Sequence, residues 1–233
     1  GAIAEKFLKQ LNISVTAYAK SIGPVEVSPE RMDLSEIQNN RFCFPDAEAA
    51  KEAESYLDQK IAECDSVGGV VECVISGLPV GLGEPVFEKL DANLAKAILS
   101  IGAVKGFEIG DGFAATKACG SENNDEFRMD GDKIVKETNH AGGVLGGISD
   151  GSDVIFRAAF KPTPSIAKSQ ETVTKDGENI DLVIHGRHDP VVIPRAVVVV
   201  ESMAAITAMD MLLMSMTSRL DLIQMFFQVE NAD

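Results

Sequence analysis

Apolar and polar positions along the chain follow two different periods. Strand-like patterns of alternating or β-branched residues run through 12–21, 70–76, 103–109, 154–160 and 180–184. Helical patterns run through 1–11, from Pro45-Asp46 to about 64, and through 85–100 and 111–119. Strands and helices therefore interleave, but too irregularly to predict a βαβ repeat.

The longest predicted helix, residues 195–220, is apolar almost all round, with Glu201 and Asp210 as its only internal charges. A helix of that kind is expected to be buried in a core or a subunit interface. Residues 120–137 and 168–179 are polar excursions. We expect the first to be a long loop or an irregular hairpin, and both to be mobile or functional.

Composition narrows the class of protein. The 233 residues carry a net charge of −15, which argues against nucleic acid and anionic membranes as partners. No uninterrupted apolar run approaches the roughly 20 residues of a spanning helix, and no targeting segment is recognisable. The four cysteines form no CxxC pair, so we expect reduced thiols in a cytoplasmic protein and no metal site. The length allows one or two domains, and we expect one. The chain opens within a helical pattern without Met or an N-cap residue, which favours a truncated start over a processed or tag-cleaved one.

A glycine-rich stretch, NHAGGVLGGIS at 139–149, is the first candidate site. Its four glycines let the backbone approach a ligand closely and offer N–H groups to an anion. A tight turn between strands explains the same pattern equally well. The stretch lacks the Lys-Ser/Thr of a Walker loop and the context of a dinucleotide fingerprint.

Two further stretches carry unusual chemistry. In FKPTPS at 160–165 two prolines make a rigid segment that presents Lys161, Thr163 and Ser165, which suits a phosphate or ribityl chain, although a solvated strand exit is the plainer interpretation. In HGRHDP at 185–190, Arg187 can bind phosphate or carboxylate and Asp189 can act as a base, with a surface turn as the alternative. Residues 139–200 hold six basic against seven acidic residues, so this region is nearly neutral in an acidic chain, as an anion site requires.

Together with GGVVE at 68–72, GLGEPVF at 81–87, KGFEIGDGF at 105–113 and PRA at 194–196, these stretches resemble the chorismate synthase family in the same order. The resemblance extends over about residues 1–215. It implies an α+β fold, a partial chorismate synthase-like β-α-β sandwich, and a homotetramer built as a dimer of dimers. It also implies a lyase that converts 5-enolpyruvylshikimate 3-phosphate to chorismate and phosphate with reduced FMN.

The family's site residues transfer to this chain by motif. The family's acidic residue near flavin N5 corresponds to Asp189, and Arg187 joins it as the second expected catalytic residue. The residues expected to bind the cofactor are Gly102, Ala103, Gly146, Lys161, Pro162, Thr163, Pro164, Ser165 and Arg187.

The family's N-terminal half, with two catalytic histidines, several substrate-binding arginines and a serine-rich flavin segment, has no match here. We therefore expect the chain to be inactive alone. The alternatives are a non-catalytic fragment that folds or oligomerises, and a different flavin- or nucleotide-phosphate-binding module that shares these loops.

Overall fold

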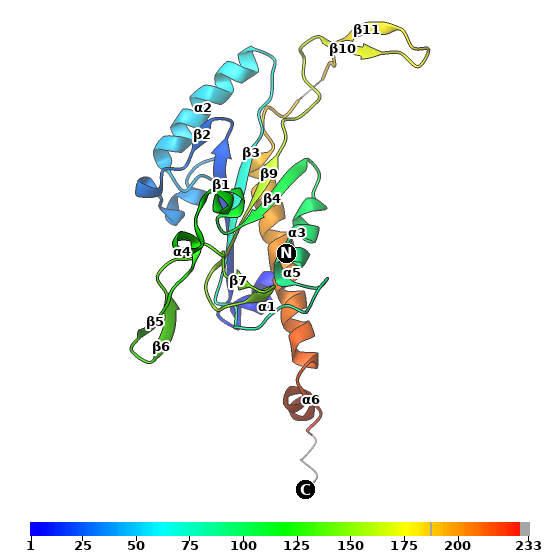
Figure 1. The fold of residues 1–233 in the computed structure, drawn as a ribbon. Coiled ribbons are helices and arrows are strands. Elements are labelled where there is room, and N and C mark those ends of the chain that lie inside the picture. The colour runs from blue at the N-terminus through cyan, green and yellow to red at the C-terminus, as the bar shows by residue number, and fades with distance from the viewer. Residues whose placement is uncertain (187, 229–233) are drawn as a thin grey trace.

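The computed structural model describes residues 1–186 and 188–228. Its centre is a five-stranded sheet in the order β2-β1-β3-β9-β4, in which every neighbouring pair is antiparallel (Figure 1). The strands are β1 (Ser14–Ile22), β2 (Val25–Glu26), β3 (Gly69–Ser76), β4 (Val104–Ile109) and β9 (Val154–Phe160). Strands from distant parts of the sequence thus share one sheet, and the α+β prediction is confirmed.

Alternation decides which face of the sheet is buried. In β9 every second residue, from Val154 to Phe160, is buried, and the residues between them are half-buried. Val71, Cys73 and Ile75 of β3 belong to the same buried core. This face is covered by helices, and the opposite face carries polar side chains.

Three helices form the covering layer: α1 (Ala2–Lys9), α3 (Leu90–Leu99) and α5 (Ile193–Thr217). In the structure α5 packs against β1 and β3, α3 packs against β4, and both α1 and α3 contact α5. The helix α2 (Ala47–Ala62) lies beside β2 and is capped by Asp46, whose carboxylate accepts the N–H groups of Glu48 and Ala49. After α5 the chain continues into α6 (Leu220–Phe227), which extends away from the sheet (Figure 1).

Within this chain the helix α5 is buried on one face, and the burial of its other face in a subunit interface stays a prediction. Ala196, Val200 and Ala204 are buried, whereas 60% of Val198 and 41% of Ile206 are exposed in this chain. By length and composition alone, α5 is long and apolar enough to cross a membrane. The core helix of a soluble protein can have the same length and composition.

Glycines and turns shorten two predicted helices. Gly110 and Gly112 have left-handed φ, and the segment predicted to be helical at 111–119 is a 3₁₀ helix, Gly112–Lys117. The helix expected from Pro85 begins at Leu90, because residues 84–88 close a turn in which Val86 has a φ of 63°.

The polar excursions contain regular structure. Residues 120–137 form α4 (Gly120–Asn123) and the hairpin of β5 (Phe127–Asp130) and β6 (Lys133–Lys136). Residues 168–183 contain the hairpin of β10 (Gln170–Val173) and β11 (Asn179–Leu182), which projects from the body (Figure 1). The remaining short elements are η1 (Pro29–Arg31), η2 (Leu34–Gln38), β7 (Val144–Leu145) and β8 (Ile148–Ser149).

Candidate functional site

Most of the expected site residues meet at one end of the sheet. The Lys161 N–H donates to the Ala103 carbonyl at 3.0 Å, which joins the exit of β9 to the entry of β4. The Ser66 hydroxyl donates to the Thr163 carbonyl at 2.7 Å. The Val67 N–H donates to the Pro190 carbonyl at 2.9 Å. The turn before β3 therefore connects residues 161–165 to residues 189–191.

The backbone at this end is tightly constrained. Ala103 has a φ of 71°, a left-handed conformation that costs a non-glycine residue about 1–2 kcal/mol. A side chain at Gly68 would collide with the Phe160 carbonyl and the Pro162 ring, so only glycine fits there. Gly102 faces open space. Strain of this kind is often retained where a backbone must meet a ligand.

One polar atom at this end is buried and unsatisfied. The Thr163 Oγ1 has no hydrogen-bond partner among the described residues. A buried hydroxyl without a partner loses roughly 1–3 kcal/mol, so a ligand oxygen or nitrogen there would be stabilising. On the same segment Lys161 is exposed and Ser165 half-buried. The donor set on residues 161–165 therefore fits a phosphate or polyol group.

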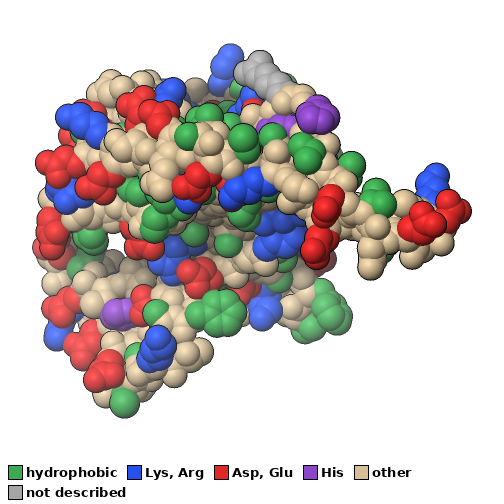
Figure 2. Space-filling view, turned by 90° about the horizontal axis from the view of Figure 1, so that it is seen from above, with side chains coloured by type: hydrophobic (Ala, Val, Ile, Leu, Met, Phe, Trp, Pro, Cys, Tyr) green, Lys and Arg blue, Asp and Glu red, His purple; other side chains and the backbone are tan. Residues whose placement is uncertain are grey.

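A pocket of about 250 Å³ lies next to this segment. It is lined by Ile61, Cys64, Asp65, Ser66, Ile166, Ala167, His188, Asp189 and Pro190. The Asp189 Oδ2 accepts a hydrogen bond from Arg195 Nη1 at 2.6 Å. Lys168 spans the same region and donates to Asp65 at 2.6 Å, and this bond, with the Ser66 N–H, lowers the pKa of Asp65. Arg187, expected beside Asp189, lies outside the described residues. Figure 2, seen from above, shows mixed acidic and basic side chains at this end.

Gly146 does not join this cluster. The neighbouring Gly147 carbonyl accepts the Leu90 N–H at 2.8 Å, which places the glycine-rich stretch at the start of α3 and the entry of β9. Lys161 follows the exit of β9, seven residues or about 23 Å further along that strand. The structure thus divides the expected cofactor residues between two ends of the sheet.

The glycine-rich stretch is held by a buried ion cluster that the sequence pattern did not reveal. The Asp125 carboxylate accepts the N–H groups of His140 at 2.7 Å and Ala141 at 3.0 Å. Lys136 Nζ, with 3% of its side chain exposed, lies 3.1 Å from Asp125 and 2.8 Å from Asp150. Burial acts to raise the pKa of Asp125, but these donors outweigh it and hold the pKa far below its usual value. Asp125 and Lys136 come from a segment interpreted only as polar.

The face of the sheet opposite the covering helices carries a second polar group that the sequence did not predict, and its Tyr18 and Glu72 side chains are buried. Tyr18, Glu72, Arg157 and Glu108 lie directly opposite one another on four adjacent strands. The Tyr18 hydroxyl donates to Glu72 at 2.5 Å, and Arg157 Nε lies 2.8 Å from Glu108. Burial and the Glu72 carboxylate raise the pKa of Tyr18 well above its usual value. The sequence shows polar residues alternating with apolar ones within these strands. It does not show which of these polar residues lie opposite one another on adjacent strands.

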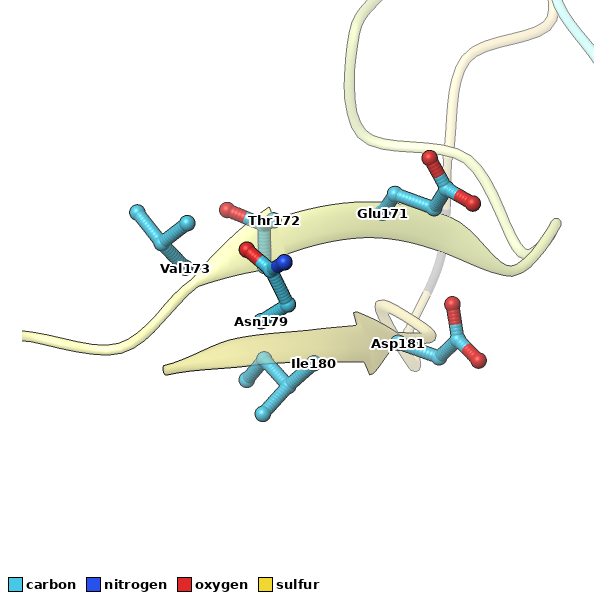
Figure 3. Close-up of a pocket in the computed structure, with 6 residues that line it drawn as sticks. All are labelled: Glu171, Thr172, Val173, Asn179, Ile180 and Asp181. Carbon is cyan, nitrogen blue, oxygen red and sulfur yellow. The ribbon is translucent and has the colours of Figure 1, made fainter. Parts of the chain in front are cut away.

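A larger depression, about 420 Å³, lies on the β10–β11 hairpin and away from the cluster. Figure 3 shows Glu171 and Asp181, which are paired across the two strands, with their carboxylates on the same side of the hairpin. This depression is formed by one exposed hairpin alone. Among residues 1–186 and 188–228, no group of three or more His, Cys, Asp or Glu side chains is placed to hold a metal ion.

The fold and the site define an α+β protein with an anion-compatible cluster of loops at one end of an antiparallel sheet. The sequence model of the chorismate synthase family matches residues 1–213. The chain belongs to the chorismate synthase family, whose members are lyases of aromatic biosynthesis.

Curated relatives support this assignment and show its extent. The chain is 58% identical over 229 residues to the chorismate synthase of Lachnoclostridium phytofermentans, and 60% identical over 228 residues to that of Agathobacter rectalis. Each match covers 98% of this chain and 62% of the relative. A crystal structure of a chorismate synthase matches with a TM-score of 0.77 and 30% identity, covering 92% of this chain and 61% of that one. The chain thus spans about 62% of the length of these relatives.

Proposed function

We propose that residues 1–233 form a single domain of a cytoplasmic chorismate synthase, which converts 5-enolpyruvylshikimate 3-phosphate to chorismate and phosphate with reduced FMN. The observation that carries this proposal is the convergence of Ala103, residues 161–165 and Asp189 at one end of the sheet. Sequence similarity to enzymes of that name supports it.

The residues at this end fit the cofactor. The open backbone at Gly102 and Ala103 would contact the flavin, while Lys161, Thr163 and Ser165 would hold its phosphate or ribityl chain and Pro162 and Pro164 keep that segment rigid. The unpaired Thr163 hydroxyl supports this role, because the ligand would satisfy it. Gly146 is too distant to join them within one chain, so its proposed contact requires another copy or the remaining length found in the relatives.

Reduced FMN, when bound, supplies electron density while the allylic phosphate leaves, with no net oxidation. The task of Asp189 is to present a carboxylate that accepts a proton at flavin N5. Arg187 is proposed to place a guanidinium beside the reacting groups, where it stabilises developing negative charge. The protein otherwise orients the two rings and excludes water from them.

The substrate side of the site is proposed to come from the remaining length of the relatives. A substrate with a phosphate and two carboxylates needs several guanidinium groups. In this chain Arg31, Arg128 and Arg157 are already paired with Asp46, Glu137 and Glu108. The exposed apolar face of α5 is the surface on which that remaining part would pack, since it is too apolar to be left in water.

The family resemblance implies a homotetramer arranged as a dimer of dimers, and the exposed side of α5 offers apolar surface for assembly. The same surface favours the second candidate function, a folding or oligomerisation fragment that binds nothing productively.

Co-expression distinguishes these candidates. The chain would be co-expressed with residues of a full-length relative that precede the matched region, and chorismate formation measured with reduced FMN. We expect turnover from the pair and none from either part alone. Stable association without turnover would contradict the enzyme and favour the oligomerisation fragment.

A further inference from the structure

The first turn of α5 contains a charge that does not suit it. The helix dipole favours acidic residues at its N-terminus and disfavours basic ones by about 0.3–1 kcal/mol. This turn has no acidic residue and no side-chain cap, and it contains Arg195. The helix dipole therefore does not explain why a guanidinium lies at this position.

Asp189, four residues before the helix begins, accounts for the guanidinium. Arg195 Nη1 donates to Asp189 Oδ2 at 2.6 Å, and the two side chains are 70% and 35% exposed. Backbone hydrogen bonds hold the main chain around both residues. The Pro190 carbonyl accepts the Val67 N–H, and the N–H groups of Arg195 and Ala196 both donate to the Val192 carbonyl at 3.0 Å.

We propose that Arg195 is a positioning residue for Asp189, an inference that rests on the proposed function. Its hydrogen bond occupies Oδ2 and keeps the carboxylate turned to one side of the 250 Å³ pocket. Among the described residues no hydrogen bond reaches Oδ1, which stays available to accept a proton from the flavin. The guanidinium also offsets the negative charge that Asp189 would otherwise place beside a reduced, electron-rich ring.

The competing role for Arg195 is direct contact with a ligand phosphate, to which guanidinium groups bind well. The two roles differ in their dependence on Asp189. A positioning residue loses its effect when Asp189 is neutralised, whereas a phosphate ligand keeps it.

A double-mutant cycle on the full chain separates them. Dissociation constants for oxidised and reduced FMN would be measured by anaerobic fluorescence titration. The variants are Arg195→Gln, Arg195→Lys, Asp189→Asn, and the double variant that combines Arg195→Gln with Asp189→Asn. Arg195→Gln should lower the preference for reduced over oxidised FMN by about tenfold, within the usual range of coupling between sites. Arg195→Lys should restore most of it, and Arg195→Gln should change it less than about twofold in the Asp189→Asn background.

Arg219→Gln is the matched control, because Arg219 forms a comparably exposed pair with Asp221 on the adjoining segment. It should leave both dissociation constants unchanged. Equal weakening of both flavin forms by Arg195→Gln, persisting with Asp189→Asn, would overturn the inference in favour of phosphate contact.

A structural readout keeps the inference separate from the proposed function. If no variant and no wild-type chain binds FMN, the proposed function fails, and a crystal structure of Arg195→Gln still tests the positioning. The Asp189 carboxylate should then rotate away from its wild-type direction. An unchanged Asp189 side chain would overturn the inference.

Discussion

At the scale of single residues, Asp189 is the described side chain on which the proposed chemistry depends most. It lines the pocket, is only partly exposed, and has Arg195 as its hydrogen-bond partner. The sequence motif was sufficient to single it out. The partner was not predicted, because a motif names residue types and says nothing about which side chains meet.

Asp189→Asn in the complete enzyme should retain FMN binding and melt at nearly the same temperature, because the ion pair it breaks is exposed. Turnover should fall by roughly 10²–10⁴, the usual contribution of a proton-transfer group. Steady-state kinetics with reduced FMN and thermal melting provide the two measurements. An unchanged rate would remove Asp189 from the mechanism.

Asp125 makes the free energy of unfolding depend on pH in the acid range. Its pKa is depressed in the folded state, so its contribution is present above the unfolded pKa of about 3.9 and is lost as the pH falls below that value. Asp125→Asn should cost about 3 kcal/mol at pH 7, because it leaves Lys136 buried with one fewer partner. Urea unfolding at pH 7 and pH 3 should show the difference shrinking in acid. A constant difference would contradict this account.

At the scale of elements, hydrophobic periodicity found the strands of the main sheet and the helices that cover it, apart from the two-residue β2. These segments bury one face, and the buried positions therefore show as a periodic pattern of apolar residues in the sequence. The first strand of the β10–β11 hairpin was missed and the 3₁₀ helix Gly112–Lys117 was found only as a helical pattern, because turns and backbone hydrogen bonds define these elements and they bury little.

The two faces of α5 should respond differently to charge. Val200 is fully buried and Val198 is 60% exposed, although they are two residues apart. Val200→Asp should prevent stable folding, since it buries an unpaired carboxylate. Val198→Asp should change the free energy of unfolding by less than about 0.5 kcal/mol and reduce self-association of the isolated chain.

Thermal melting and light scattering of these two variants provide the test, with each serving as the control for the other. Equal destabilisation by both substitutions would show that the Val198 face is buried in solution.

At the scale of the whole molecule, the net charge leads us to expect that the chain alone does not catalyse the proposed reaction. A net charge of −15 repels a substrate with three anionic groups. The chain alone should therefore form no chorismate with excess reduced FMN, and should bind FMN weakly. Product assay and flavin titration check both statements. Normal turnover by the isolated chain would mean that the substrate-binding groups lie among its own residues.

The sequence by itself determined the family through its motifs and, through that resemblance, the α+β fold, while periodicity and turn residues marked most of the segments worth examining. Only the tertiary structure decided which segments meet. It joined residues 66–67 to 161–165 and 189–191, paired Arg195 with Asp189, and placed Gly146 at the far end of β9. It also left one face of α5 uncovered. These outcomes depend on hydrogen bonds and packing between residues far apart in the chain, and local patterns carry no record of such distances.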